Sequence, residues 1–117
     1  MRKTYRYRDL ILSVSEEKEV VFSVQFISDG NLGHTTVYLP NAENVQIENS
    51  GSDSFGIGKD LHHEIIVGVT DISNPIPEED TIRVNFLIND AVIVSHSNLK
   101  SEEERPIIIL YFKFVLP

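Results

Sequence analysis

Ile and Val together outnumber Ala by 26 to 2 in this chain, and this imbalance most constrains its fold. β-Branched side chains lose rotamer freedom in a helix but pack well on a pleated sheet, whereas Ala, Leu and Met favour helices. Leu contributes only 9 residues and Met only 1, while Ser (11) and Asn (8) supply residues suited to turns. The composition therefore predicts an all-β protein.

Apolar and polar residues alternate in several short runs, as expected for strands with one buried face. Ile65, Val67 and Val69 form one such apolar row. We expect a core that includes Phe22, Val24, Phe26, Val67, Val84, Phe86, Leu110 and Phe112. About eight strands at a spacing of roughly 8 to 12 residues predict an antiparallel β-sandwich, jelly-roll or immunoglobulin-like. The length of 117 residues matches a single domain over 1–117.

Polar stretches separate the predicted strands. We interpret residues 29–34, 49–60 and 73–80 as loops because they are rich in Gly, Ser, Asn, Asp and Pro. Asn89 and Asp90 tolerate left-handed backbone conformations, so this pair is predicted to form a two-residue hairpin turn.

The first predicted strand contains a break in its alternation. Tyr5 and Tyr7 occupy odd positions, whereas the apolar residues of 10–14 occupy even ones. A single β-bulge near Asp9 would bring all of them to one face. Alternatively, the tyrosine segment leaves the sheet and packs elsewhere.

The C-terminal run 107–116 is apolar at nearly every position, and only Lys113 and the Tyr111 hydroxyl interrupt it. A strand that is apolar at nearly every position has no polar face to turn toward water. We therefore expect a central strand that is covered on both sides, or on one side by a partner chain.

Charge and residue content exclude several classes of protein. With 10 basic and 18 acidic residues the formal net charge is −8, which argues against a nucleic-acid-binding protein. The sequence contains no run of 18 apolar residues, so no membrane-spanning helix is predicted, and the absence of cysteine excludes disulfides. Because no signal-peptide pattern follows the first basic residues, we expect a cytoplasmic protein.

The charges are distributed unevenly along the chain. Residues 1–8 hold 4 of the 10 basic residues and no acidic one, so the remainder has a net charge of −12. Such a basic arm either folds back on its own acidic body or reaches an acidic neighbour, including a second copy. The candidate protein-interaction residues are therefore Arg2, Lys3, Tyr5, Arg6, Tyr7 and Arg8.

Patterns for metal or nucleotide binding fall short of their chemical requirements. His62 and His63 are adjacent, so on a strand they would point to opposite faces and could not bind one ion together. The glycine-rich stretch 51–60 lacks the Gly-Lys-Ser/Thr ending of a phosphate-binding loop. Asp53 and Asp60 do not have the spacing of an EF-hand, although a looser calcium site remains open. We therefore predict no cofactor and no metal.

Nucleophilic catalysis finds no support, because cysteine and the Gly-x-Ser-x-Gly pattern are both absent. The main hypothesis is a non-enzymatic interaction or structural subunit that self-associates or docks on another protein. The alternative is a small-ligand or carbohydrate-binding module that uses loops 29–34, 49–60 and 73–80. A third hypothesis is an acidic inhibitor that mimics nucleic acid.

Overall fold

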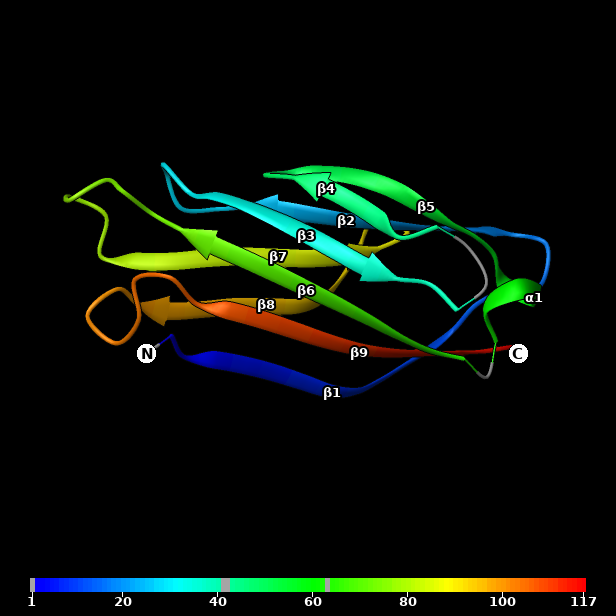
Figure 1. The fold of residues 1–117 in the computed structure, drawn as a ribbon. Coiled ribbons are helices and arrows are strands. Elements are labelled where there is room, and N and C mark those ends of the chain that lie inside the picture. Colours follow the sequence, from blue (N-terminus) through cyan, green and yellow to red (C-terminus); the bar gives the residue numbers. More distant parts are fainter. Residues whose placement is uncertain (1, 41–42, 63) are drawn as a thin grey trace.

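The computed structural model describes residues 2–40, 43–62 and 64–117. In these ranges the chain forms nine strands and one helical turn: β1 (Thr4–Ser13), β2 (Glu19–Phe26), β3 (Leu32–Tyr38), β4 (Val45–Glu48), β5 (Gly51–Ile57), α1 (Gly58–Leu61), β6 (Ile65–Ser73), β7 (Thr81–Ile88), β8 (Ala91–Leu99) and β9 (Ile107–Val115). The strands form two packed sheets, so the protein is a β-sandwich (Figure 1). Its extents of 45 × 23 × 23 Å make it elongated along the strands.

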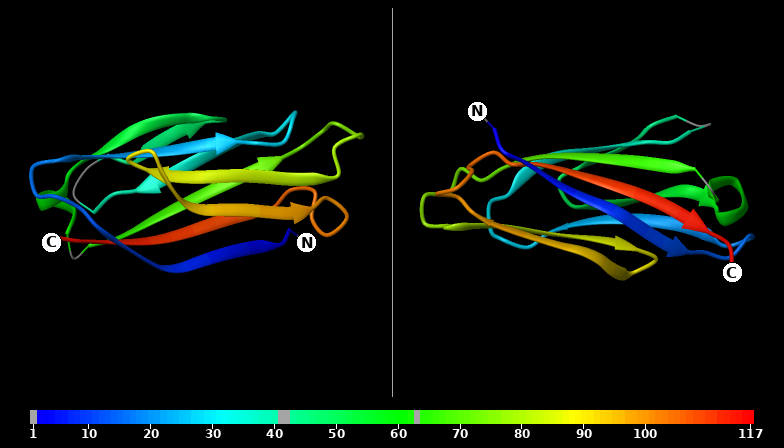
Figure 2. Two further views of the ribbon diagram at one scale, coloured as in Figure 1. Left: turned by 180° about the vertical axis from the view of Figure 1, so that it is seen from behind. Right: turned by 90° about the horizontal axis from the view of Figure 1, so that it is seen from below.

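The two sheets differ in their strand directions. The five-stranded sheet has the order β1-β9-β6-β3-β4, and the four-stranded sheet has the order β5-β2-β7-β8. β1 pairs parallel to β9, whereas the remaining strand pairs are antiparallel. Figure 2 shows β1 (blue) and β9 (red) side by side in both views. The expectation of purely antiparallel sheets is therefore wrong for the five-stranded sheet.

The ninth strand lies where the sequence predicted a loop. Residues 49–60 contain β5 and α1 in addition to the turn that follows β4. β5 pairs with β2, and Phe55 on β5 is buried in the core. Its Ser and Gly residues are typical of loops, and they are tolerated in a strand here because β5 lies at the edge of the sheet. Residues 29–34 likewise include the start of β3.

The break in β1 is a β-bulge at Asp9, as one of the two sequence interpretations predicted. Asp9 has a positive φ of 60°, and the pairing with β9 shifts between Tyr7 and Leu10. Tyr7, Leu10 and Leu12 consequently pack on the same core. Residues 4–8 therefore belong to the sheet, and the basic segment folds back onto its own chain.

The turn between β7 and β8 also matches the prediction. Asn89 and Asp90 both have positive φ, at 48° and 68°, and they connect Ile88 directly to Ala91. The Asn89 side chain accepts a hydrogen bond from the Val21 backbone N–H at 2.9 Å, which ties this turn to β2.

Aromatic side chains from both sheets build the centre of the core. Phe22 stacks on Phe55 with ring centroids 5.3 Å apart and meets Phe112 edge-on at 5.6 Å. Six of the expected core residues are buried, namely Phe22, Val24, Val84, Phe86, Leu110 and Phe112. Phe26 and Val67 are only half-buried.

The misplacement of Val67 affects the whole of β6. The buried face of this strand carries Ile66, Gly68, Thr70 and Ile72, so the apolar row through Ile65 and Val67 faces outward. Because the inward positions 68 and 70 hold Gly and Thr, the sequence pattern does not show that this face is the buried one. Thr70 is nevertheless satisfied in the core, because its hydroxyl bonds to that of Thr35 at 2.8 Å.

Candidate interaction surface

The outer side of the five-stranded sheet carries apolar residues where water-facing polar residues are usual. Strand register aligns Ile109 with Val69, and Tyr111 with Val67, which in turn lies opposite Tyr38. We call this surface the apolar face; it comprises Ile11, Leu32, Tyr38, Ile65, Val67, Val69, Ile107, Ile109 and Tyr111.

Exposure is pronounced at the margins of the apolar face. Ile65 is 66% exposed, Ile11 61% and Tyr38 50%. Between these side chains the valines, Ile109 and Tyr111 are half-buried by their neighbours on the sheet. The result is an apolar surface that crosses β9 and β6 and reaches β3 at Tyr38, whereas Thr36 and His34 separate Tyr38 from Leu32 on β3. Contiguous apolar surfaces commonly mark sites of protein association.

Charged residues flank the apolar face on its two outermost strands. Arg6 and Arg8 point outward from β1, and Arg8 places its guanidinium carbon 4.9 Å from the centre of the Tyr111 ring. On the opposite margin, Glu48 of β4 lies 2.9 Å from Nδ1 of His34. The face therefore has two arginines on the β1 margin and a single carboxylate, that of Glu48, on the β4 margin.

A hollow opens in the apolar face beside the bulge of β1. Its volume is about 260 Å³, and it is lined by Asp9, Ile11, Ile65, Tyr111, Phe112 and Lys113. The bulge removes two β1 residues from regular pairing and leaves this space beside the edge strand. An apolar side chain from a partner fits the chemistry of the hollow, because most of its lining is apolar.

The outer side of the four-stranded sheet is different. Its middle carries neutral polar side chains that bond to one another: the Ser23 and Ser52 hydroxyls are 2.7 Å apart, and the Ser95 hydroxyl donates to Asn85 at 2.7 Å. Exposed large apolar residues on β8 are Val92 and Leu99, near the strand ends. Val21 and Leu87, the latter paired with Val92, add apolar side chains near the β7–β8 turn, so the polar character belongs to the middle of this surface.

The first basic residues of the chain bind acidic groups of the same molecule. The Arg2 guanidinium forms an ion pair with the Asp71 carboxylate and donates to the Arg105 carbonyl at 2.7 Å. The Lys3 backbone N–H donates to the Glu103 carboxylate. Hydrogen bonding from Arg2 lowers the pKa of Asp71 and Asp71 in turn raises the pKa of Arg2. Among the described residues, Arg6 has no ion-pair partner.

Tyr5 and Tyr7 point inward, toward the gap between the edge strands β1 and β8. The Tyr7 hydroxyl lies 2.6 Å from Nδ1 of His96, a residue that is only 1% exposed. Tyr5 meets the same imidazole edge-on, with ring centroids 4.7 Å apart. These contacts connect the two sheets at an edge where no backbone pairing links β1 to β8 in the described chain.

Hydrogen bonding determines which ring nitrogen of His96 carries the proton. The Asn98 amide donates to the carbonyls of Leu99 and Glu103, both at 3.0 Å, so its oxygen is left to accept from His96 Nε2 at 2.8 Å. Nδ1 then accepts the Tyr7 hydroxyl proton. Burial lowers the pKa of His96, although the hydrogen bond to Asn98 opposes the shift, and burial raises the pKa of Tyr7. Both groups are therefore neutral and structural.

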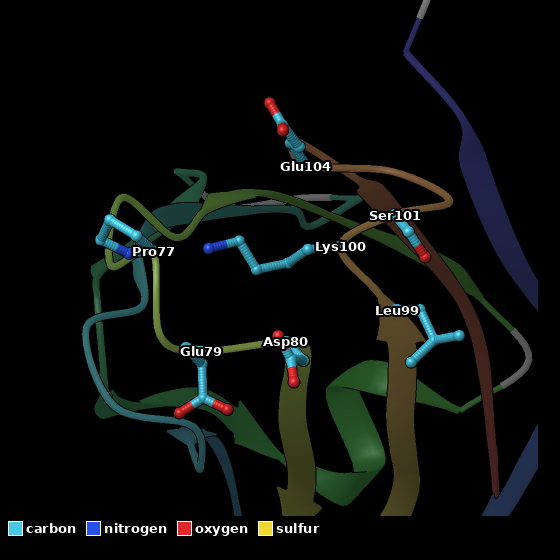
Figure 3. Close-up of a pocket in the computed structure, with 7 residues that line it drawn as sticks. All are labelled: Pro77, Glu79, Asp80, Leu99, Lys100, Ser101 and Glu104. Carbon is cyan, nitrogen blue, oxygen red and sulfur yellow. The ribbon is translucent and has the colours of Figure 1, made fainter.

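A second hollow, of about 490 Å³, lies at one end of the sandwich and is mainly polar; its lining is Pro77, Glu79, Asp80, Leu99, Lys100, Ser101 and Glu104. Figure 3 shows Lys100 reaching across it toward the loop of Pro77. The Lys100 ammonium donates to the Ile76 carbonyl at 2.7 Å, which holds the 73–80 loop against β8. Lys100 therefore links the segment after β8 to the 73–80 loop.

The residues considered for metal binding are dispersed. His34 is on β3 and His96 is inside the sandwich, while His63 lies outside the described residues. Asp53 is on β5, where its carboxylate accepts the Ser54 N–H, and Asp60 is in α1. Among the described residues, no three His, Cys, Asp or Glu side chains gather closely enough to hold a metal ion.

Comparison with known proteins gives no assignment: no protein-family model, no curated protein and no solved structure matches this chain. In the described ranges, no helix has the length and apolar character needed to cross a membrane.

Sequence reasoning identified part of this surface. The run 107–116 indicated a strand with two apolar faces, and a partner chain on one side was one expectation for it. The apolar face on β6 was missed because the alternation was assigned to the core. Tyr38, beside Pro40, gave no signal of its own, since only the register of β3 places it against Val67.

Proposed function

We propose that the protein is a non-enzymatic interaction or structural subunit, and that the apolar face is its docking surface. The observation that carries this proposal is the apolar continuity from Ile109 through Val69 and from Tyr111 through Val67 to Tyr38. In a single sandwich such an outer face would be exposed to water at a cost of roughly 25 cal/mol per Å². Covering it with another protein recovers that free energy.

Three further observations support docking over catalysis. The apolar face has no nucleophile and base in contact, His96 is committed to structural hydrogen bonds, and the ammonium of Lys100 is bound to a carbonyl. The partner is therefore expected to be a protein, by self-association or by docking, without a cofactor and without nucleic acid. A cytoplasmic location, and a jelly-roll or immunoglobulin-like topology, remain predictions.

The small-ligand alternative is less favoured. Of the three segments expected to form a binding site, 49–60 is mostly β5 and α1, and residues 29–34 run into β3. Asn74 and Asn31 hold the remaining loops together through a hydrogen bond of 2.8 Å between their side chains. Asn74 is also bonded to the Asp29 carbonyl at 2.8 Å, so these polar groups are already occupied.

A face-specific capture experiment tests the proposed function. Immobilised wild-type protein is compared with Val69→Glu, which places a charge in the apolar face, and with Ser23→Glu, the matched change on the other sheet. We expect partners, including added copies of the chain itself, to be retained by wild type and Ser23→Glu and lost by Val69→Glu. Equal binding by all three chains, or none by wild type, would reject the proposal.

A further inference from the structure

The outer margins of the apolar face carry opposite charges, and this identifies its occupant. We propose that the apolar face docks a second copy of this chain, face to face, with β1 of each copy lying over β4 of the other. This inference rests on the proposed function and names its partner. It goes beyond it by fixing both the identity and the orientation of that partner.

Symmetry limits the arrangements to be considered. Two identical faces that meet are related by a two-fold axis lying between them. Aligned sheets keep their strand directions within about 30° of each other, so the axis runs either along the strands or across them. An axis along the strands places β1 over β4 of the other copy. An axis across them places β1 over β1.

Charge selects between these two arrangements. Over β1 of another copy, Arg6 and Arg8 would face a second Arg6 and Arg8, and like charges placed in this way are unfavourable. Over β4, strand register places Arg6 level with Gln46 and two residues along the strand from Glu48. The Glu48 carboxylate bonds to His34 of its own chain through Oε1, yet its side chain is 80% exposed, so a long arginine side chain can approach it diagonally. Arg6 lacks an ion-pair partner within the described part of its own chain and is therefore available for this contact.

The same arrangement brings apolar residues together in the middle. β6 occupies the centre of the five-stranded sheet, so Val67 and Val69 meet their own equivalents at the two-fold axis. Tyr111 on β9 lies above β3 of the other copy, which carries Tyr38. Asp71 also lies on this central strand, but its charge is neutralised by Arg2 of the same chain.

The area reaches the lower limit expected for a biological dimer. Five strands at ~4.8 Å spacing, with about seven residues each at ~3.4 Å, give a face of roughly 24 by 24 Å. Two such faces bury roughly 1,100 Å² in projection, which exceeds the ~1,000 Å² expected of a biological interface.

Mixing of two charge-reversed chains tests the orientation. The proposed dimer has two symmetry-related diagonal contacts between Arg6 of one copy and Glu48 of the other. Arg6→Glu turns each contact into a pair of carboxylates, and Glu48→Arg turns each into a pair of guanidiniums. Because each change acts twice, we expect each variant alone to raise the dimer dissociation constant at least about 10-fold. An equimolar mixture restores both attractive pairs, so the heterodimer should regain wild-type affinity.

The measurement is sedimentation equilibrium over a range of concentrations, with circular dichroism to establish that each variant is folded. Val69→Glu should abolish the dimer, and Ser23→Glu should leave it unchanged. Absence of rescue in the mixture, with both single variants weakened, would overturn the proposed orientation. A wild-type protein that stays monomeric would overturn the second copy as partner. Face-specific capture of a different protein would then preserve the proposed function, and its failure would reject both.

Discussion

The two outer faces of this sandwich are built on the same core yet have opposite character. On the four-stranded sheet, serine and asparagine side chains bond to each other across strands, as between Ser95 and Asn85. On the five-stranded sheet, the middle of β9 and β6 holds valine, isoleucine and tyrosine instead. Folding requires only the inner alternation, so the outer residues are free to serve another purpose. The contrast supports the proposal that the five-stranded face meets a partner.

A substitution in the core between the two sheets should have the largest effect on the stability of the protein. Phe86 lies on the four-stranded sheet, is fully buried and stacks with Phe22 at 6.1 Å. Phe86→Ala should lower the free energy of unfolding by about 3 to 5 kcal/mol, through lost burial and a cavity. Denaturant melts provide the measurement. A loss below about 1 kcal/mol would show that the stability of the sandwich does not depend on the Phe86 side chain.

The two sheets are also linked at one edge, where Tyr5 and Tyr7 of β1 contact His96 of β8. His96→Ala would leave the Tyr7 hydroxyl and the Asn98 oxygen buried without their partner. We expect a loss of about 2 to 4 kcal/mol in unfolding free energy, from unsatisfied polar groups and a cavity. Tyr7→Phe, which keeps the ring and its packing, serves as the milder comparison. If His96→Ala melts like wild type, the cluster does not hold the sheets together.

Acidification tests the same edge without mutation. Because burial lowers the pKa of His96 in the folded state, the unfolded chain binds this proton more readily. Stability should be complete above the unfolded pKa of about 6.5 and should fall as the pH drops below it. Asp71, whose pKa is also lowered, contributes a separate loss at more acidic pH.

Unfolding free energies measured from pH 8 to pH 5 would check this prediction. The control is a His96→Gln variant, in which the slope between about pH 6.5 and 5 should be reduced. An identical slope in both proteins would assign the effect to other histidines.

Matched surface substitutions give the smallest change in stability and the sharpest test of the comparison. Val69→Thr and Asn85→Thr each replace an outward residue in the middle of a strand by the same β-compatible residue. Both should change the unfolding free energy of the monomer by about 0.5 kcal/mol or less. Only Val69→Thr should weaken association in sedimentation experiments. Equal effects on association would remove the functional distinction between the faces.

The sequence predicted the fold class well because strand formation is a local property. The bulge at Asp9 and the turn at Asn89 followed from the spacing of apolar residues and from turn chemistry. The assignment of β6 failed because both of its faces carry apolar residues, and only pairing with β3 and β9 decides which one is inside. The parallel pairing of β1 was also out of reach, since it depends on residues 103 positions apart, as between Thr4 and Ile107.

The pairing of β1 with β9 has a consequence for how the chain reaches its native state. The first strand cannot complete its hydrogen bonds until the last one has been synthesised, and β9 also supplies the neighbour of β6. Pairings between such distant segments carry a large loop-closure entropy, and domains dominated by them fold in milliseconds to seconds. During that interval the edge of β6 that pairs with β9 has no partner strand. We therefore expect the apolar strands β6 and β9 to be exposed during folding, when pairing within the chain competes with contact between chains.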